Sequence, residues 1–170
     1  MIATGIDLGE AFAVAQVGHG PQGYFLLALA EKNSVRDPAG CLALLQAMPT
    51  PDVIACEDLF FSAEKPRALR AERMVGVIDV AIQFRAWPKL QRISPLTVKE
   101  IATGYGLAQK EAVRKVMIAL FPRFENGDAV NWGERTLNAS DAAAIAYAAL
   151  VQMEGKVGQG VMKFGRRKKL

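Results

Sequence analysis

The chain has 170 residues, of which 51% are hydrophobic and 22% charged, and its net charge at pH 7 is +4. This length and composition are those of one folded domain and exclude a disordered chain. No apolar run reaches the roughly 18 residues that a membrane span requires, and the first residues lack the basic start and apolar middle of a signal peptide. The two cysteines are too few for a disulfide framework or a metal cluster. We therefore expect a cytoplasmic protein.

Basic residues are concentrated at the C-terminus. The final segment, KFGRRKKL, carries five of the 21 lysines and arginines, which leaves 16 basic against 17 acidic residues in the rest of the chain. Such a run makes sequence-independent contacts with a polyanion, although a solubilising tail would have the same composition. We expect a folded domain over residues 1–155 and a basic tail over residues 156–170.

The first half of the chain predicts three antiparallel strands joined by tight turns, then a helix, then a strand parallel to the first. The strands are expected over residues 1–9, 11–18, 24–31 and 52–57. The helix is expected over residues 37–48, because Asp37 is a suitable N-cap and Pro38 suits the first turn. A strand reached through a helix tends to run parallel to the strand before it.

The second half predicts a long helix, a short strand, three further helices and a polar loop. The helices are expected over residues 64–87, 95–101, 108–120 and 139–153, the strand over 89–94 and the loop over 126–138. The long helix has too many apolar residues for one narrow stripe, so the sheet, other helices or a second subunit should cover it on more than one side. The pattern predicts one α/β domain with a mixed five-stranded sheet flanked by helices.

Acidic residues stand at the ends of two predicted strands. Asp7 lies near the carboxyl end of the first strand and Glu57 ends the fourth. If these two strands are adjacent and parallel, roughly 5 Å apart, both carboxylates could face one small volume. Asp141, near the start of the last helix, is a third candidate. Anions this close need protons or cations, and a hard divalent ion suits oxygen ligands. Three such carboxylates are typical of two-metal phosphodiester cleavage, which requires neither histidine nor serine.

Each carboxylate also has a purely structural interpretation. Asp7 could form a turn, and Glu57 could pair with a buried arginine. With Asn138 as the N-cap, Asp141 would occupy the third position of the helix in a capping-box arrangement. The one histidine, His19, lies in a predicted turn and is not expected to be catalytic. A phosphate-binding Walker loop is absent, and TGYG is too short to be a dinucleotide fingerprint.

The chain resembles the RuvC family of Holliday junction resolvases in four segments that occur in the family's order. They are GIDLG, ACEDLFF, VKEIATGYGLAQKEAVRKVM and NASDAAAIAYAAL. The third is the distinctive one, with a Val-Lys pair, a Thr-Gly-x-Gly turn and a second lysine before a helix. The resemblance spans nearly the whole chain. It implies a ribonuclease H-like fold, a homodimer, and magnesium-dependent, paired, symmetric nicking of four-way DNA junctions.

The resemblance also implies roles for individual residues. Asp7, Glu57 and Asp141 match the family's metal-binding acids, which would hold two Mg²⁺ ions per active site, with Mn²⁺ as a substitute. Lys99 and Lys110 match its basic residues near the scissile phosphate, and we also place Lys110 among the catalytic residues. The DNA contacts that we expect are Phe60, Lys99, Lys110, Arg67, Arg70, Arg166, Arg167, Lys168 and Lys169. A lysine is a compact charge for a phosphate, and an aromatic ring can stack on an unpaired base. Core packing for Phe60, and an exposed helix face for the lysines and for Arg67 and Arg70, remain open alternatives.

One position departs from the family pattern. Where the family places aspartate or histidine three residues before the last aspartate, this chain has Asn138. An amide oxygen can bind magnesium but brings no charge, so we expect Asn138 to be a weaker ligand of the second ion. Asp128 or Glu134, in the preceding loop, could supply the missing acid instead. A smaller departure is Leu8, where a proline commonly follows the first aspartate.

The sequence therefore predicts a Holliday junction resolvase, a metal-dependent endodeoxyribonuclease that acts on four-way junctions as a homodimer. One alternative is a ribonuclease H-like nuclease that acts on other branched DNA or on RNA. Another is a junction-binding protein with weak catalysis, which the uncharged Asn138 makes possible. The sequence does not identify a helicase partner.

Overall fold

The structure is a computed structural model that describes residues 1–8, 11–32, 37–58 and 66–155, with the backbone alone for residues 66–71. Its strands are β1 (Ile2–Leu8), β2 (Phe12–Gly20), β3 (Gly23–Lys32), β4 (Val53–Glu57) and β5 (Leu90–Ile93). Its helices are α1 (Pro38–Gln46), α2 (Pro66–Phe84), α3 (Pro95–Thr103), α4 (Lys110–Leu120), the 3₁₀ helix η1 (Trp132–Glu134) and α5 (Leu137–Met153). Within the described residues, no helix is long and apolar enough to cross a membrane.

The strands form one mixed sheet in the order β3-β2-β1-β4-β5. β1 pairs antiparallel with β2, and β2 antiparallel with β3, as the turn signals predict. β4 pairs parallel with β1, and β5 parallel with β4. The meander, the parallel fourth strand and the mixed five-stranded sheet are therefore confirmed. The order places the carboxyl ends of β1 and β4 side by side in the middle of the sheet.

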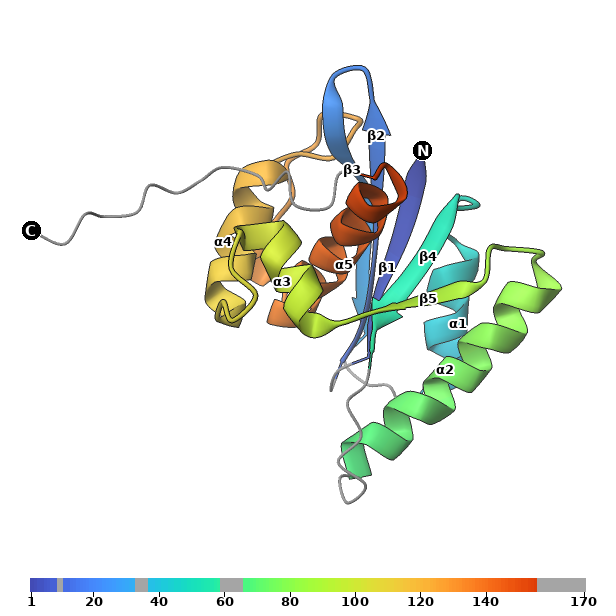
Figure 1. The fold of residues 1–170 in the computed structure, drawn as a ribbon. Coiled ribbons are helices and arrows are strands. Elements are labelled where there is room, and N and C mark those ends of the chain that lie inside the picture. Colours follow the sequence, from blue (N-terminus) through green and yellow to red (C-terminus); the bar gives the residue numbers. More distant parts are fainter. Residues whose placement is uncertain (9–10, 33–36, 59–65, 156–170) are drawn as a thin grey trace, which may run out of the picture.

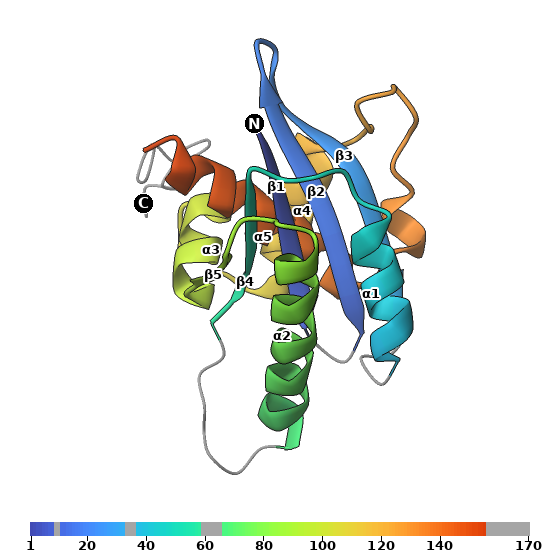
Figure 2. The same cartoon turned by 90° about the vertical axis from the view of Figure 1, so that its right-hand side faces the viewer.

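Helices cover both faces of the sheet (Figure 1). α5 packs along β1, β2 and β4, with α3 and α4 against it on the same side. α1 and α2 cover the other face, and Figure 2 shows both helices in front of the strands. Side chains of β1 alternate between the two cores: Ala3 belongs to the α5 side and Ile6 to the α1–α2 side. The alternation decides which strand residues can meet α5.

The long predicted helix is shorter than expected. α2 ends at Phe84, three residues before the predicted end at Trp87. Met74, Ile78 and Ile82 are buried against the sheet, whereas Phe84 is 88% exposed, although its apolar character suggested a covered position. The described part of α2 thus has one face on the core and leaves Phe84 uncovered within the single chain.

The predicted polar loop before the last helix is partly wrong. Residues 126–138 contain η1 and the first residues of α5, and the Trp132 side chain is 5% exposed. Trp132 Nε1 donates to the Phe121 carbonyl at 2.8 Å. The Arg114 guanidinium of α4 donates to the carbonyls of Trp132 and Arg135, the latter at 2.9 Å. Tertiary hydrogen bonds therefore fix the segment that leads into α5, which composition alone did not indicate.

Candidate active site

Asp7 and Glu57 lie at the carboxyl ends of the neighbouring parallel strands β1 and β4. In the β1–β4 ladder Ile6 lies opposite Cys56, so Asp7 and Glu57 follow as the next residues of the two strands. Ile6 and Cys56 belong to the core under α1 and α2. Because side chains alternate along a strand, Asp7 and Glu57 project to the opposite face, which α5 covers. The Asp7 residue is 8% exposed. The structure therefore brings these two predicted site residues together.

Asp141 reaches the same region because α5 lies unusually close to β1. A Cβ atom built on Gly5 would lie 2.2 Å from the Ala142 carbonyl oxygen and 2.3 Å from the Ala146 nitrogen. Only glycine permits this approach, and the alanines of α5 that face the sheet are fully buried. Asp141 directly precedes Ala142, so the crossing places it on the α5 side of the strand ends.

Charges on several elements act on the Glu57 carboxyl group at the end of β4. Burial raises the pKa of Glu57 above its ordinary value, and the negative charge of Asp141 raises that pKa further. The charges of Lys110 and Lys99 act in the opposite direction on the same carboxyl group. Charges from α3, α4 and α5 therefore act together on the end of β4.

Lys110, the first residue of α4, contacts Asp141 directly. Its ammonium group donates a short hydrogen bond to the Asp141 carboxylate, and the two form an ion pair. Partial burial lowers the pKa of Lys110, but this hydrogen bond and the negative charges of Asp141, Asp7 and Glu57 together raise it above its ordinary value. The Lys110 side chain is still 55% exposed, so its ammonium group also faces solvent.

The oxygen atoms that could bind a metal ion here belong to the carboxylates of Asp7, Glu57 and Asp141. Among the described residues, no three histidine, cysteine, aspartate or glutamate side chains are gathered in a group that could hold a metal ion. Asp141 is instead engaged by Lys110. Yet three carboxylates on one side of the sheet, one of them with its pKa raised by burial and by a neighbouring anion, have the chemistry that a hard cation stabilises. The residue types fit a divalent metal if Asp141 turns from Lys110.

Asn138 is not the N-cap of the last helix, so the capping-box interpretation is wrong. Thr136 is the N-cap, and its side-chain oxygen accepts a hydrogen bond from the Asn138 backbone nitrogen at 3.2 Å. α5 begins at Leu137, which makes Asn138 its second residue and Asp141 its fifth. Residues three apart on a helix share a face. The side chains of Asn138 and Asp141 thus lie on the same side of α5.

Other predicted residues lie elsewhere. The Asp128 side chain accepts a hydrogen bond from Asn126 Nδ2 at 2.8 Å, within its own loop, and Glu134 is exposed in η1. His19 is at the opposite end of the sheet from Asp7, where it pairs with Glu154 and stacks on Tyr24 with ring centroids 4.5 Å apart. His19 therefore has no place in the site, as expected.

Several predicted DNA contacts lie outside the described residues. Phe60 and the tail from residue 156 onward are among them, and the tail includes Arg166, Arg167, Lys168 and Lys169. Arg67 and Arg70 lie on α2, but only their backbone is described. Their expected roles stay predictions.

Sequence reasoning missed two residues that contact the start of α5. Thr136 caps the helix, and the Glu31 carboxylate of β3 accepts a hydrogen bond from the Thr136 hydroxyl group at 2.7 Å. Thr136 was recognisable as a possible cap, because threonine is a favoured N-cap residue. No local signal linked Glu31 to residue 136, since the two are 105 positions apart in the chain.

Comparisons with known proteins agree with this architecture. A family model described as "Crossover junction endodeoxyribonuclease RuvC" matches residues 29–149, which include Glu57, Lys99, Lys110 and Asp141 but not Asp7. A protein of that name from Heliobacterium modesticaldum is 33% identical over 135 residues, which cover 71% of this chain and 80% of the relative.

Other curated relatives match over shorter segments. The Carboxydothermus hydrogenoformans protein of the same name is 31% identical over 105 residues, 62% of this chain and 61% of the relative. The Acidobacterium capsulatum protein is 39% identical over 70 residues, 41% of this chain and 40% of the relative. The chain thus spans about half the length of these two relatives.

Solved structures match over nearly the whole fold. The Thermus thermophilus RuvC structure has a TM-score of 0.70 at 24% identity and covers 92% of this chain and 98% of that one. A structure of T. thermophilus RuvC in complex with Holliday junction substrate has a TM-score of 0.71 at 27% identity and covers 92% of this chain and 97% of that one. These likenesses establish a RuvC-type, ribonuclease H-like fold, and with the family match they show that the chain belongs to the RuvC family.

Proposed function

We propose that this chain is a Holliday junction resolvase, a metal-dependent endodeoxyribonuclease that makes paired symmetric nicks in four-way DNA junctions. The observation that carries the proposal is the meeting of Asp7 and Glu57 at neighbouring strand ends, with Asp141 and Lys110 on the same side of the sheet. Family membership and the fold shared with a RuvC bound to junction substrate support the choice of DNA.

We propose that Asp7, Glu57 and Asp141 hold two magnesium ions, with the Asn138 amide oxygen as a weaker ligand and manganese as a substitute. The raised pKa of Glu57 supports this, because a nearby cation would favour the charged carboxylate. Ions held there would supply the activation of water for attack on the phosphodiester and the stabilisation of the leaving oxygen.

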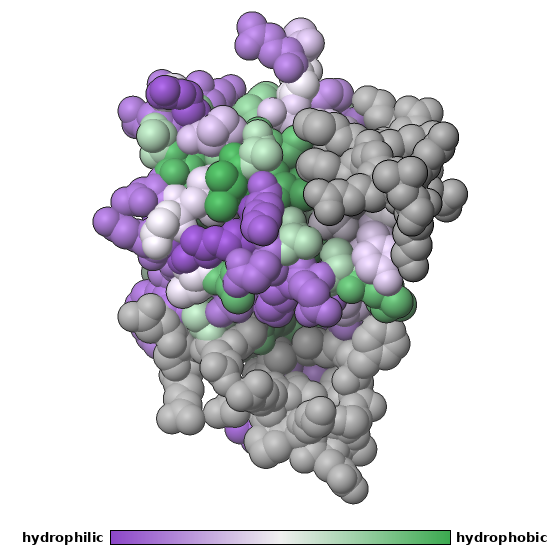
Figure 3. All heavy atoms as spheres, turned by 90° about the vertical axis from the view of Figure 1, so that its left-hand side faces the viewer, coloured by the Kyte–Doolittle hydropathy of each residue, from purple (hydrophilic) through white to green (hydrophobic). Residues whose placement is uncertain are grey.

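The two lysines act on the phosphate. Lys110 is half-exposed beside Asp141, and the charge of Lys99 reaches Glu57 from α3. An ammonium group is a compact charge that can donate to phosphate oxygens, so these residues orient the scissile phosphate and stabilise the charge that develops on it. Figure 3 shows the side of the molecule formed by α3 and α4, where hydrophilic residues predominate around smaller apolar areas.

The proposal includes a homodimer. Two subunits related by a twofold axis would present two active sites to a junction that is itself roughly twofold, which accounts for paired nicks. We assign the interface to α2, where Val80 is 54% and Phe84 88% exposed in the single chain. Phe60, Arg67, Arg70 and the basic tail are the proposed DNA contacts beyond the site.

The test compares a labelled four-way junction with a linear duplex of the same sequence, in magnesium, with reaction products resolved at nucleotide resolution. Paired, symmetric nicks confined to the junction would support the proposal. Equal cleavage of both substrates would favour the alternative of a ribonuclease H-like nuclease with broader DNA or RNA specificity. Tight junction binding without nicks would contradict catalysis and favour a junction-binding protein.

The uncharged Asn138 is the specific observation that favours weak catalysis, and it yields a prediction. Asn138→Asp should lower the magnesium concentration for half-maximal nicking by about fivefold. Fivefold is a lower bound, because two unit charges about 4 Å apart interact by about 1 kcal/mol even in bulk water and Mg²⁺ carries two charges. The measurement is a magnesium titration of the single-turnover nicking rate.

The matched control is Gln22→Glu, which adds the same charge in the exposed turn between β2 and β3, at the opposite end of the sheet from Asp7. We expect no change in the magnesium midpoint for this variant. An unchanged midpoint for Asn138→Asp as well would show that residue 138 is not a metal ligand. Because Thr136 caps the helix, a capping role for the Asn138 side chain would not explain either result.

A further inference from the structure

Glu31 lies on the same row of the sheet as Asp7. In the strand pairings Asp7 is opposite Ala13, and Ala13 is opposite Glu31. Directly opposite residues project to the same face of a sheet, and Ala13 belongs to the core under α5. Glu31 therefore projects to the α5 side at the end of the sheet that carries the acids. Two strand spacings separate it from Asp7, roughly 10 Å.

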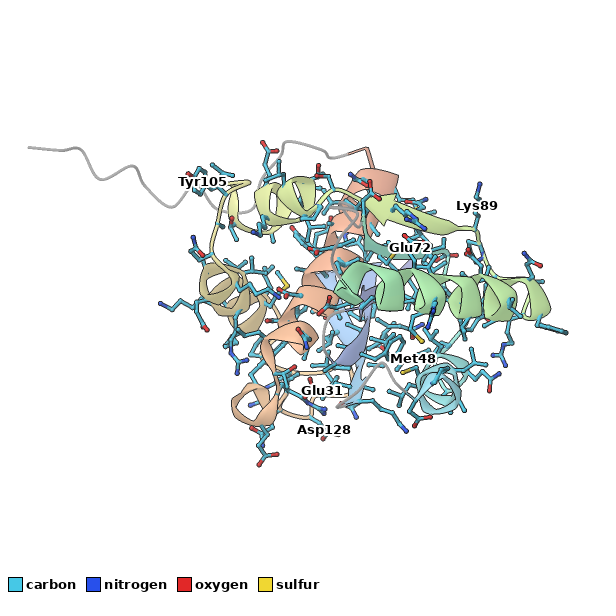
Figure 4. The ribbon with its side chains drawn as sticks, turned by 90° about the horizontal axis from the view of Figure 1, so that it is seen from below. Glu31, Met48, Glu72, Lys89, Tyr105 and Asp128 are labelled. Atoms are coloured by element: carbon cyan, nitrogen blue, oxygen red, sulfur yellow. The ribbon has the colours of Figure 1, made fainter. Side chains whose placement is uncertain are left out.

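The Glu31 carboxylate binds the first residue before α5. It accepts hydrogen bonds from the Thr136 hydroxyl group at 2.7 Å and from the Thr136 backbone nitrogen at 3.3 and 3.4 Å. The Thr136 oxygen in turn accepts from the Asn138 backbone nitrogen at 3.2 Å. Figure 4 labels Glu31 close to the orange ribbon that leads into α5. A side chain of β3 thereby completes the N-cap of α5.

This contact determines where α5 starts relative to β1. Asn138 and Asp141 lie on the first two turns of the helix, so their positions follow from the placement of Thr136. A helix end without its cap loses hydrogen bonds to its first backbone nitrogens, and its first turn frays. A carboxylate at this end also interacts favourably with the positive end of the helix dipole.

We propose that Glu31 is a positioning residue for the metal-binding site, acting through Thr136 to hold Asn138 and Asp141 over Asp7. The inference rests on the proposed metal-dependent function. Glu31 does not contact the reacting groups itself. Its carboxylate fixes the start of α5, so that the ligands on the first two turns need not become ordered when the ion binds.

The first test needs no substrate and no metal. In Glu31→Ala, amide hydrogen exchange at Asn138, whose nitrogen donates to the Thr136 oxygen, should be roughly fivefold faster in the metal-free protein than in the wild type, the change expected for a weakened cap. Thr136→Val, which removes the hydroxyl group but keeps the glutamate, should have a similar effect. The double variant should show less than the sum of the two single effects, because both variants remove the hydrogen bond between the Thr136 hydroxyl group and the Glu31 carboxylate. Full additivity would overturn the proposal.

The second test measures binding of Mn²⁺ by calorimetry, together with the metal midpoint for junction nicking. Glu31→Ala should weaken Mn²⁺ binding roughly fivefold, and Glu31→Gln, which keeps an acceptor oxygen for the Thr136 hydroxyl group, should restore most of the affinity. The matched control is Glu125→Ala, which removes an exposed glutamate from the loop before η1. Unchanged binding in Glu31→Ala, or an equal loss in Glu31→Gln and Glu31→Ala, would overturn the proposal.

Equal losses in those two variants would mean that only the charge of Glu31 matters. A different result would contradict the proposed nuclease function, namely a wild-type protein that does not nick junctions. Amide exchange in the metal-free protein is independent of that result. The two failures are therefore distinguishable.

Discussion

Replacement of Asp7 by asparagine is expected to lower the single-turnover rate of junction nicking at least about 1,000-fold. The reason is that a metal ion contributes several kcal/mol of transition-state stabilisation, and each 1.36 kcal/mol is a factor of ten in rate. Asparagine has nearly the same shape as aspartate, so the β1 ladder should persist. Junction affinity in the absence of metal should be retained. The measurements are nicking rates in magnesium and fluorescence anisotropy with a chelator.

Among the three acids, Asp7 is the best position to substitute in this test. It is 8% exposed, and its negative charge contributes to the raised pKa of Lys110. Glu125→Gln is the matched control, since it removes one negative charge from an exposed loop position. We expect it to nick like the wild type. An Asp7→Asn protein that remained folded and nicked within tenfold of the wild-type rate would contradict the assignment of Asp7 as a metal ligand.

Much of the fold follows from local patterns. Turn signals and strand composition predicted the meander, and the helix between the third and fourth strands predicted that β4 runs parallel to β1. From that relation alone, Asp7 and Glu57 were expected side by side. The placement of Lys99 and Lys110 near the acids came instead from the family resemblance, because no local rule brings α3 and α4 to the end of β4.

The start of α5 shows what the sequence could not decide. Thr136 and Asn138 are both favoured N-cap residues, two positions apart, so local preference does not choose between them. The choice is made by tertiary contacts: Arg114 and the buried Trp132 hold the preceding segment, and Glu31 binds Thr136. Local preference likewise gave no sign that Gly5 is the point where α5 crosses β1.

Gly5 should therefore tolerate no side chain. Gly5→Ala is expected to lower the free energy of unfolding by about 2 kcal/mol or more, because overpacking of a close-packed interior typically costs about 1–3 kcal/mol and here the new methyl group meets backbone. The added Cβ would lie 2.2 Å from the Ala142 oxygen and 2.9 Å from the Ala146 Cα, so α5 must move from the sheet. The melting temperature should fall by roughly 4–8 °C. Thermal and denaturant unfolding measure both quantities.

The same substitution in α2 should have the opposite sign. Gly76 is exposed within the helix, and a Cβ there would meet nothing within 4 Å. Gly76→Ala should thus stabilise the protein by about 0.5–1 kcal/mol, through helix propensity and a less flexible unfolded chain. Displacement of α5 also moves Asp141, so at a temperature where Gly5→Ala remains folded, its nicking rate should fall. Equal stabilities for the two variants would contradict the close approach of α5 to β1, and with it the placement of Asp141 beside Asp7 and Glu57.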